Sequence, residues 1–324
     1  MLSKESLLQQ LKFTLIDTNF DYLGRKYAGK VRDNYSTPDG LRVLISTDKL
    51  SAFDRNITSI PFKGEVLTQT SNFWFERTKH IIANHVVATP DSNSVVGIEC
   101  DPLKIEFIVR GYITGSTDTS IWSSYQKGER LIYGIQFKDG LNKNDKLDAP
   151  IVTPTTKAPQ GQHDERITRD EIISQGILSQ EDYDYLAQKS VELYEFGLEQ
   201  CAKNGLILMD TKYEFGRTKD GEIVLIDEIH TPDSSRFAIA ATFEERTKAG
   251  LEPENLNKEF LRLWLAKTGY KGEGKVPEIP DDVRVETAIK YIEAYEKITG
   301  QSFTSEVGDV TTRIDQNLKK HFNL

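Results

Sequence analysis

Two apolar runs that end in charged residues, with a short polar segment between them, constrain this chain more than any other feature. The first run starts at Leu206 and reaches Gly216, and the second starts at Ile223 and leads into Asp227 and Glu228. The segment between them carries Asp-Gly, a dipeptide typical of tight hairpin turns. The pattern therefore predicts an antiparallel hairpin over residues 206–216 and 222–228.

Charged side chains are expected to gather on one face of this hairpin. Asp210, Lys212 and Glu214 are two residues apart, and residues two apart on a strand share a face. Asp227 is expected to join them from the second strand. Three carboxylates and one ammonium are costly on a sheet face unless they bind something. A solvated face held by salt bridges is the other interpretation of the same residues.

A polar loop follows the second strand and ends in an arginine. After Asp227 and Glu228 come Thr231-Pro232-Asp233-Ser234-Ser235 and then Arg236. A strand that ends in acids suits a metal ion, and a loop with hydroxyls, backbone N–H groups and a guanidinium suits a phosphate. An ordinary strand end followed by a polar turn has a similar composition. The functional interpretation is one small site that holds a metal and an anion together.

A second hairpin is expected near the N-terminus. The chain reads Gly29-Lys30-Val31-Arg32-Asp33, reaches Asp39-Gly40, and continues as the apolar run 41–45. Lys30 and Arg32 are predicted to project from the same side of the first strand. A basic hairpin of this kind can lie over nucleotide phosphates, although the chain contains no phosphate-binding loop of the G-x-x-x-x-G-K-[ST] type.

Composition indicates a globular protein and excludes several classes of partner. The 324 residues include 41 Lys plus Arg against 50 Asp plus Glu, a formal charge of −9 that argues against non-specific nucleic-acid binding. No segment has the length and apolarity of a membrane span, and the first residues lack the apolar core of a secretory signal. The two cysteines, Cys100 and Cys201, have no metal-ligand spacing. We therefore expect a cytoplasmic protein without nucleic-acid or membrane partners.

The remaining pattern predicts three regions. Helices are expected at 3–12, 65–82, from Arg169 after a Thr168 cap, at 180–204 after a Ser179 cap, at 255–267, at 281–298 and from about Ser305. Residues 98–102 resemble a linker, and 136–166 read as a long polar loop of the kind that is usually functional. The predicted domains are an N-terminal β-rich lobe at 1–102, an α+β lobe at 103–250 and a C-terminal helical region at 251–324.

Taken together, the motifs resemble the SAICAR synthetase (phosphoribosylaminoimidazole-succinocarboxamide synthase) family in its single-function form. The resemblance rests on segments 29–33, 51–54, 106–116, 157–165, 210–216 and 227–236, in the same order and spacing, and spans roughly residues 20–245. It implies an α+β, two-lobed fold with a kinase- or ATP-grasp-like nucleotide cleft between β-rich lobes, followed by C-terminal helices. In such a fold the lobe at 1–102 would cover the nucleotide, and the lobe at 103–250 would carry the metal and ribonucleotide sites.

The resemblance also implies a reaction. Members of the family use ATP and Mg²⁺ to join L-aspartate to the carboxylate of carboxyaminoimidazole ribonucleotide in purine biosynthesis, and they release ADP and phosphate. A free carboxylate is a poor electrophile, so phosphoryl transfer to it would give an acyl phosphate that the aspartate amine attacks. Such transfer depends mainly on positioning and on charge neutralisation.

Each motif position then receives an expected role. Lys212 and Asp210 are the catalytic candidates, and Asp227 with Glu214 would hold Mg²⁺. ATP would be bound by Lys30, Arg32 and the segment from Leu103 to Glu106. The ribonucleotide phosphate would meet Arg110, Ser116, Ser235 and Arg236, its imidazole and ribose would meet Asp48, Ser51 and Asp54, and L-aspartate would meet His163 and Asp164.

Two other functions share some of these features. A different small-molecule phosphotransferase with a two-lobed, kinase-like site would share the basic hairpin and the acidic strand, but the His-Arg-Asp loop and the Asp-Phe-Gly motif of protein kinases are absent. A non-catalytic nucleotide sensor would bind ATP without turnover. The sequence leaves open whether the chain is a monomer or a homodimer, the order of substrate binding, the general base, and whether the acyl phosphate is a discrete intermediate.

Overall fold

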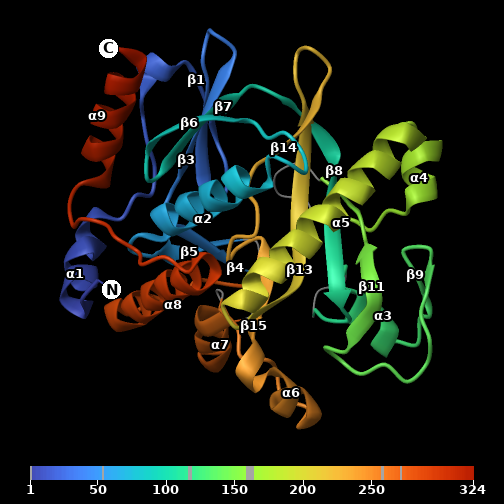
Figure 1. Ribbon diagram of the computed structural model, residues 1–324. Helices are drawn as coiled ribbons and strands as arrows, with labels where there is room; N and C mark the ends of the chain where they lie inside the picture. The colour runs from blue at the N-terminus through green and yellow to red at the C-terminus, as the bar shows by residue number, and fades with distance from the viewer. Residues whose placement is uncertain (1, 53–54, 116–118, 158–163, 257–258, 271) are drawn as a thin grey trace.

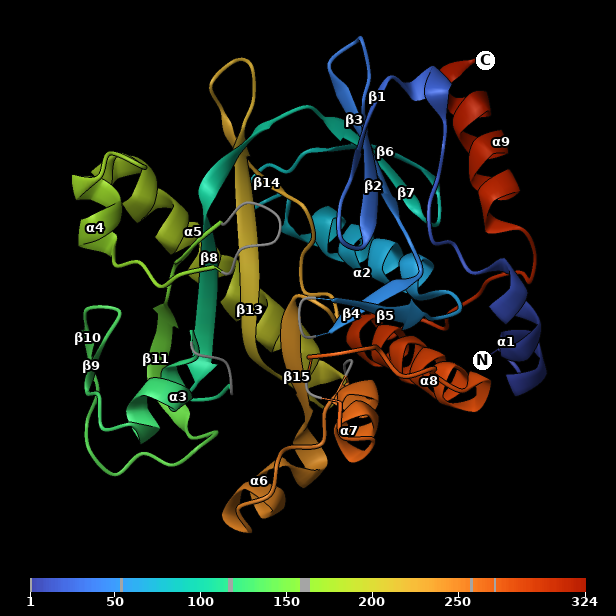
Figure 2. The same ribbon diagram turned by 180° about the vertical axis from the view of Figure 1, so that it is seen from behind.

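The computed structural model describes residues 2–52, 55–115, 119–157, 164–256, 259–270 and 272–324. In this part of the chain, two antiparallel sheets with helices around them form the main body (Figures 1 and 2). The mixture of helices and antiparallel strands agrees with the predicted α+β class. No helix within the described residues has the length and apolarity needed to cross a membrane.

The first sheet is built from the N-terminal third of the chain. Its strand order is β1-β2-β3-β7-β6. The strands are β1 (Arg25–Ala28), β2 (Arg32–Ser36), β3 (Leu41–Ser46), β6 (Val86–Asp91) and β7 (Ser94–Ile98). A separate pair, β4 (Lys49–Ala52) and β5 (Arg55–Ser59), follows β3, and α2 (Lys63–Thr78) comes next along the chain.

The predicted hairpin at Asp39-Gly40 is confirmed, with one difference at its basic end. The chain turns between β2 and β3, and Gly40 has the positive φ of 77° that such a turn requires. Arg32 is the first residue of β2, but Lys30 lies in the bend between β1 and β2. The two cations therefore do not project from one strand, because a second turn precedes Arg32.

The second sheet has the predicted acidic hairpin at its centre. β13 (Leu206–Arg217) pairs with β8 (Asp101–Tyr112) on one side and with both β14 (Ile223–Ile226) and β15 (Ser235–Ile239) on the other. Outer strands β11 (Lys146–Val152) and β12 (Thr155–Thr156) pair with β8. Residues 136–166, expected to be one loop, therefore include two strands that complete this sheet.

One long helix covers a face of the second sheet. α5 (Gln180–Lys203) crosses β8 and β13 in both views (Figures 1 and 2). Its predicted start is confirmed, because the Ser179 side chain accepts a hydrogen bond from Asp182 N. The shorter α4 (Arg169–Ser174) begins at the predicted Thr168, which forms a complete capping box with Glu171.

A small subdomain stands beside β8 and β11. It contains α3 (Ile121–Gln126) and a two-stranded hairpin of β9 (Leu131–Ile132) and β10 (Ile135–Gln136). A core of its own holds it together, formed by Ile113, Ile121, Tyr125, Ile132 and Phe137.

The helices at both ends of the chain pack on the sheets and on one another. α1 (Lys4–Gln10) is extended by a 3₁₀ turn at Leu11–Phe13, with another turn at Asp21–Leu23. The C-terminal helices are α6 (Ala240–Lys248), which the sequence did not suggest, α7 (Glu259–Lys267), α8 (Asp281–Thr299) and α9 (Val310–Phe322). Among the terminal helices, α9 packs on β6 of the first sheet, α8 packs on α2, α1 and α7 pack on α8, and α6 packs on β15. The last helix begins five residues later than Ser305, because Asp309 caps it by accepting from Thr311 N and Thr312 N.

The two sheets are joined through backbone contacts. β7 ends at Ile98 and β8 begins at Asp101, so the predicted linker at 98–102 shrinks to two residues. A second connection runs through Leu225, which donates its N–H to Ala83 O at 2.9 Å and accepts from His85 N at 3.0 Å. The division of the chain into three domains stays a prediction.

Candidate active site

The polar face of β13 is the centre of the candidate site. Asp210, Lys212 and Glu214 alternate along the strand as the sequence predicts. In β8, Arg110 lies opposite Asp210, and Glu106 lies opposite Glu214. Because directly opposed residues of an antiparallel pair point to the same side, the sheet adds an arginine and a fourth acid to this face.

Lys212 sits within a cluster of carboxylates. Its Nζ lies 2.7 Å from Glu106 Oε1 and 2.5 Å from Glu214 Oε1, and Lys157 forms a further ion pair with Glu214. Burial opposes the charge of Lys212, but Glu214 and Glu106 outweigh it and hold the pKa of Lys212 well above its ordinary value. The lysine is therefore a permanent cation in the middle of the strand.

The carboxylates of this cluster differ in their pKa values. Burial raises the pKa of Glu106 to about 7, against the effect of Lys212. Burial also acts to raise the pKa of Glu214, but Lys212 and then Lys157 bring it below its ordinary value. Glu214 is consequently ionised at neutral pH, as a cation ligand or ion-pair partner has to be.

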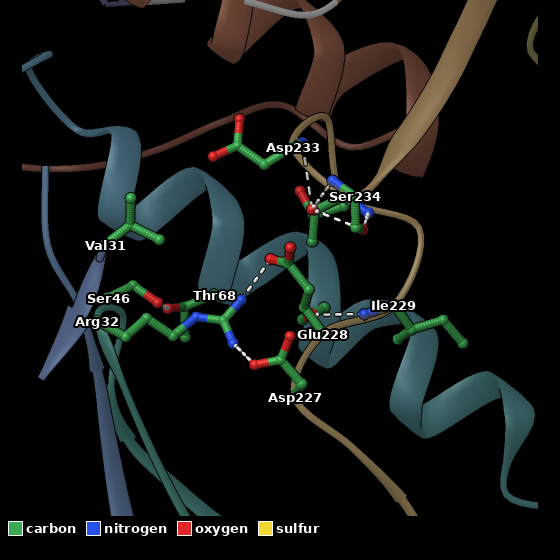
Figure 3. A network of polar contacts seen from close by, with 12 residues as sticks. Val31, Arg32, Ser46, Thr68, Asp227, Glu228, Ile229, Asp233 and Ser234 are labelled. Atoms are coloured by element: carbon green, nitrogen blue, oxygen red, sulfur yellow. Dashed lines mark hydrogen bonds and ion pairs between the residues drawn. The ribbon is translucent and has the colours of Figure 1, made fainter. Parts of the chain in front are cut away.

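The acidic end of β14 is held by an arginine from the first sheet. Arg32 donates from Nη1 to Asp227 and from Nη2 to Glu228, so one guanidinium binds two carboxylates that are adjacent in the sequence (Figure 3). Next along the chain, Ile229 N donates to Ser71 Oγ at 3.0 Å, which ties the same segment to α2. Burial lowers the pKa of Arg32, but Asp227 and Glu228 reverse this and leave it raised. The basic hairpin and the acidic strand, far apart in the sequence, thus meet.

A second basic group lies at the other end of the polar face. Arg110 and Arg236 both bind Asp210 Oδ2, the first from Nη1 at 3.1 Å. Arg110 also donates from Nε to Thr153 Oγ1 at 2.9 Å and is buried, whereas the Arg236 side chain is 35% exposed. Ser235 precedes Arg236 on β15 and is buried beside it. These contacts bring together the described residues predicted to bind the ribonucleotide phosphate.

Three contacting residues were given no role by the sequence reasoning, although Lys157 lies in a motif segment. Lys63, which is fully buried, binds Asp233 Oδ2 at 2.7 Å, and the Tyr291 hydroxyl donates to Asp233 Oδ1 at 2.5 Å. Lys157 reaches Glu214 from the segment after β12. A signal for Lys63 was present, since a lysine follows Ile60-Pro61-Phe62 at the start of a helix that is mostly buried. No local signal marks Tyr291, because aromatic residues are common in core helices.

Three predicted site residues, Asp48, Lys30 and Ser51, lie outside the contacts described above for the polar face of β13. Asp48 is 1% exposed, and its carboxylate accepts from Leu15 N at 2.8 Å and from Gly64 N at 2.9 Å. It therefore joins the N-terminal segment to α2, and its contact with substrate stays a prediction. Lys30 is exposed in its bend, and Ser51 is half-buried on β4.

The segment predicted to bind ATP, Leu103 to Glu106, lies on β8, where neighbouring segments already contact its backbone. Leu103 is half-buried, and its neighbour Lys104 accepts a hydrogen bond from Lys157 N at 3.0 Å. Glu106 pairs with β12. Asp164 is exposed and lies near enough to Glu106 to raise its pKa further.

Three predicted residues cannot be placed. Asp54, Ser116 and His163 lie outside the residues that the structure describes. In the part that is described, no group of three or more His, Cys, Asp or Glu side chains has the arrangement of a metal-ligand set. Asp227 and Glu214 are therefore still predicted, not observed, as ligands of a cation.

Comparison with known proteins gives one consistent result. Residues 25–279 match the family model described as SAICAR synthetase. The phosphoribosylaminoimidazole-succinocarboxamide synthase of Legionella pneumophila (strain Paris) is 48% identical over 314 residues, which cover 96% of this chain and 99% of that protein.

Solved structures of the same kind are similar in fold. SAICAR synthase from Saccharomyces cerevisiae, complexed with SAICAR, has a TM-score of 0.79 at 33% identity and covers 90% of this chain and 100% of its own. A type-2 SAICAR synthetase in complex with ADP has a TM-score of 0.65 at 25% identity and covers 87% of this chain and 100% of its own. The expected fold is thereby confirmed.

Proposed function

This chain belongs to the SAICAR synthetase family, and from that premise we propose which of its side chains carry out the reaction. The protein is an ATP-dependent ligase of purine biosynthesis that joins L-aspartate to the carboxylate of carboxyaminoimidazole ribonucleotide, with release of ADP and phosphate. Nothing in the comparisons favours a kinase-like phosphotransferase or a nucleotide sensor.

The nucleotide end of the site is assigned to the region around Arg32. The ADP complex of a relative shows nucleotide binding in that protein. In this chain, Lys30 and Arg32 come from the hairpin of the first sheet, and Arg32 faces the acids of the second sheet. We assign the ATP phosphates to this interface, where Arg32 would exchange its carboxylate partners for phosphate oxygens.

The acids of this end fit a divalent cation. In the described cluster, the carboxylates of Glu106, Glu214, Asp227 and Glu228 lie beside Arg32, Lys157 and Lys212, and Glu214 is ionised. Carboxylate oxygens are the ligands that Mg²⁺ prefers. Asp227 and Glu214 would hold the ion, which when bound supplies charge neutralisation at the phosphate oxygens.

The other end is assigned to the ribonucleotide. Arg110 and Arg236, with Ser235 and Ser116, would bind its 5′-phosphate, because two guanidiniums suit a dianion. Asp210, expected to be catalytic, contacts both arginines, and this supports a role in orienting them. Asp48, Ser51 and Asp54 stay the candidates for the imidazole and ribose side, and His163 and Asp164 for L-aspartate.

Lys212 lies between the two ends and is assigned to the carboxylate under attack. A carboxylate oxygen takes the phosphoryl group of ATP, and the cationic Lys212 offsets the charge on the reacting group. The aspartate amine then attacks the carboxyl carbon, the C–O bond to the phosphate breaks, and phosphate leaves with that oxygen. The amine loses a proton as the amide forms.

One observation carries this assignment: the cationic Lys212 lies on one strand face between a group of two arginines around Asp210 and the acids that pair with Arg32. A single anion-binding site beside the metal would suffice for hydrolysis of ATP. Two anion-binding sites allow ATP to react with a second substrate that also carries a phosphate.

Isotope transfer tests the mechanism. With ¹⁸O in the substrate carboxylate, one label is expected in the inorganic phosphate released, and ADP release should be strongly stimulated by L-aspartate. Unlabelled phosphate alongside normal amide formation would show that the carboxylate is not activated by phosphoryl transfer, although the family membership would stand.

A further inference from the structure

The last helix carries an arginine that is directed into the first sheet. α9 lies beside β6 (Figure 1). Arg313 of this helix donates from Nη1 to Glu65 Oε1 at 2.8 Å and from Nε to Asp91 Oδ2 at 3.1 Å. Apolar side chains attach the helix separately, because three of them are buried in the core of the sheet: Val310, Ile314 and Leu318. The arginine therefore has partners beyond those that hold the helix in place.

A third partner connects Arg313 with the end of β3. Arg313 donates from Nη2 to Asn93 Oδ1, and Asn93 is fully buried. The Asn93 backbone carbonyl accepts from Ser46 N at 2.9 Å, and Asn93 Nδ2 donates to Ser46 O at 2.9 Å. Ser46 is the last residue of β3, so Asn93 binds both backbone groups at the strand end. Because Arg313 holds the oxygen of the amide, its nitrogen faces Ser46 O.

The end of β3 in turn holds the hairpin that carries Arg32. Thr47 follows Ser46 and donates to Val31 O twice, from its backbone N at 2.9 Å and from Oγ1 at 2.7 Å. Val31 precedes Arg32, which lies opposite Ser46 in the β2–β3 pair. Figure 3 shows Val31, Arg32 and Ser46 close to one another. Hydrogen bonds and peptide bonds thus lead without a break from Arg313 to the backbone of Arg32.

A polar network of this kind fixes geometry more than it adds stability. Glu65, Asp91 and Asn93 are buried, and Arg313 contacts all three. Replacing a buried ion pair by apolar residues is often neutral or stabilising, so the net stability from such a pair is small. A fully hydrogen-bonded buried network does, however, make its surroundings rigid. The property that this network supplies is a fixed position for the end of β3.

We propose that Arg313 is a positioning residue for the nucleotide phosphates, holding the turn of Val31 and Arg32 through Asn93 and the end of β3. This inference rests on the proposed assignment of the ATP phosphates to Arg32. It adds to the nucleotide end of the site a residue beyond position 279, where the family match ends.

Arg313→Lys tests the proposal. Lysine keeps a positive charge beside Glu65 and Asp91 but loses the planar group that also reaches Asn93. We expect the dissociation constant of the non-hydrolysable ATP analogue adenylyl imidodiphosphate, with Mg²⁺, to rise roughly fivefold. Binding of the succinocarboxamide ribonucleotide product should stay unchanged. In turnover the KM of ATP should rise while kcat is kept, because Lys212 is not affected. Calorimetric titration and steady-state kinetics measure these effects.

Asn317→Ala is the matched control on the same helix. Asn317 donates to Asp91 Oδ2 at 2.6 Å, and within the described residues its side chain has no hydrogen bond to Asn93. Its removal should leave both dissociation constants unchanged, even where the thermal unfolding midpoint falls. Equal weakening of the ATP analogue in the two variants would assign the effect to the stability of α9 and overturn the proposal.

A double-mutant cycle tests the route through Asn93. Asn93→Ala removes the link between Arg313 and Ser46, and should by itself weaken binding of the analogue. In that background, Arg313→Lys should weaken binding by less than about twofold further, because residues that act in series are not additive. The same fivefold loss in both backgrounds would show that Arg313 does not act through Asn93, and the proposal would be wrong.

Arg32→Gln separates this inference from the assignment on which it rests. Weaker binding of the analogue in Arg32→Gln, together with unchanged binding in Arg313→Lys, would overturn the role of Arg313 alone. Unchanged binding in Arg32→Gln would remove the ATP phosphates from Arg32, and the proposal for Arg313 would fail with that assignment.

Discussion

Asp227 reaches the site from a backbone conformation that few residues adopt. It lies just after β14 with a φ of 68°, in the left-handed region where Asp and Asn are several-fold enriched among residues other than glycine. The backbone at this position therefore favours the same residue types that the proposed metal site needs. Asparagine preserves the conformation and removes only the charge.

We predict that Asp227→Asn lowers kcat/KM by at least ~100-fold, or about 2.7 kcal/mol of transition-state stabilisation. The Mg²⁺ concentration required for half-maximal activity should rise, because a charged ligand is lost. The thermal unfolding midpoint should change little. Titration of activity with Mg²⁺ measures the effect.

Glu228→Gln is the comparison for that experiment. Glu228 binds the other end of the Arg32 guanidinium but is not assigned to the cation. Its substitution should leave the Mg²⁺ requirement unchanged. Equal Mg²⁺ responses in the two variants would assign the effect to the position of Arg32 and remove Asp227 from the cation site.

Substitutions of Arg236 and of Lys212 should change different kinetic parameters. Arg236→Lys loses the planar guanidinium, so the KM of the ribonucleotide should rise roughly tenfold or more while the KM of ATP changes little. Lys212→Met should mainly lower kcat, since the charge beside the reacting carboxylate is lost. Steady-state kinetics with each substrate varied in turn distinguish them.

The contacts of Lys212 require a folding control. Its removal leaves Glu106 without that cation, while Glu214 keeps Lys157. The kinetic parameters of Lys212→Met and Arg236→Lys should therefore be calculated per folded protein, with the folded fraction of each variant measured separately. An unchanged ribonucleotide KM in Arg236→Lys would remove Arg236 from the phosphate site.

At the scale of elements, the face of β13 opposite its polar face contacts the loop after β14. The Tyr213 hydroxyl lies 2.6 Å from His230 Nε2, and the His230 ring packs edge-on against Trp74 at 4.8 Å between centroids. Burial lowers the pKa of His230 to about 3, so the ring is neutral. The loop after β14 is thus anchored by an uncharged histidine.

α5 leaves room for this histidine only because Gly197 has no side chain. A Cβ at position 197 would lie 2.4 Å from His230 Cε1. Gly197→Ala should therefore lower the free energy of unfolding by about 1–3 kcal/mol, despite the better helix propensity of alanine, because the ring has to shift. The shift would also displace the loop, so kcat/KM should fall.

Gly308→Ala provides the control, since nothing lies within 4 Å of an added Cβ and its φ is not positive. Chemical denaturation compares the two variants. Equal stability would show that His230 can move without cost and that α5 does not fix the loop.

At the scale of the whole molecule, a C-terminal helix is tied to the proposed substrate loop. Asp233 lies between Lys63 of α2 and Tyr291 of α8, and α2 and α8 pack against each other. The Lys63 ammonium also lies 5.4 Å from the centre of the Tyr291 ring. The helices after residue 279, where the family match ends, therefore contribute to the geometry of the loop.

We predict that Tyr291→Phe lowers the free energy of unfolding by about 1–2 kcal/mol and weakens binding of the ribonucleotide several-fold. Asp233 would keep Lys63 but lose one of the two groups that fix its orientation. Tyr295→Phe removes a hydroxyl from the same helix, where it bonds to Gln301, and should not affect binding. Loss of stability without any change in ribonucleotide affinity would limit Tyr291 to a structural role.

The features that the sequence predicted are local ones. The hairpins at Asp39-Gly40 and Asp220-Gly221 follow from turn dipeptides, and the shared face of Asp210, Lys212 and Glu214 follows from the two-residue period of a strand. The caps at Thr168 and Ser179 depend on backbone groups three residues away. The reaction was predicted from the family resemblance. Its motifs are short segments, and their order along the chain can be recognised without the structure.

The partners of those side chains were decided only by the tertiary structure. Arg32 meets Asp227 across 195 residues of sequence, and Lys63 meets Asp233 across 170. Such pairs depend on how the two sheets and α2 pack, which no local pattern encodes. The backbone partners of Asp48 were also decided by packing, because its carboxylate accepts from the N–H groups of Leu15 and Gly64, which lie on two different segments. The sequence by itself determined which chemical groups are present and on which strand faces, because alternation and turns are local, while long-range packing determined which of them touch.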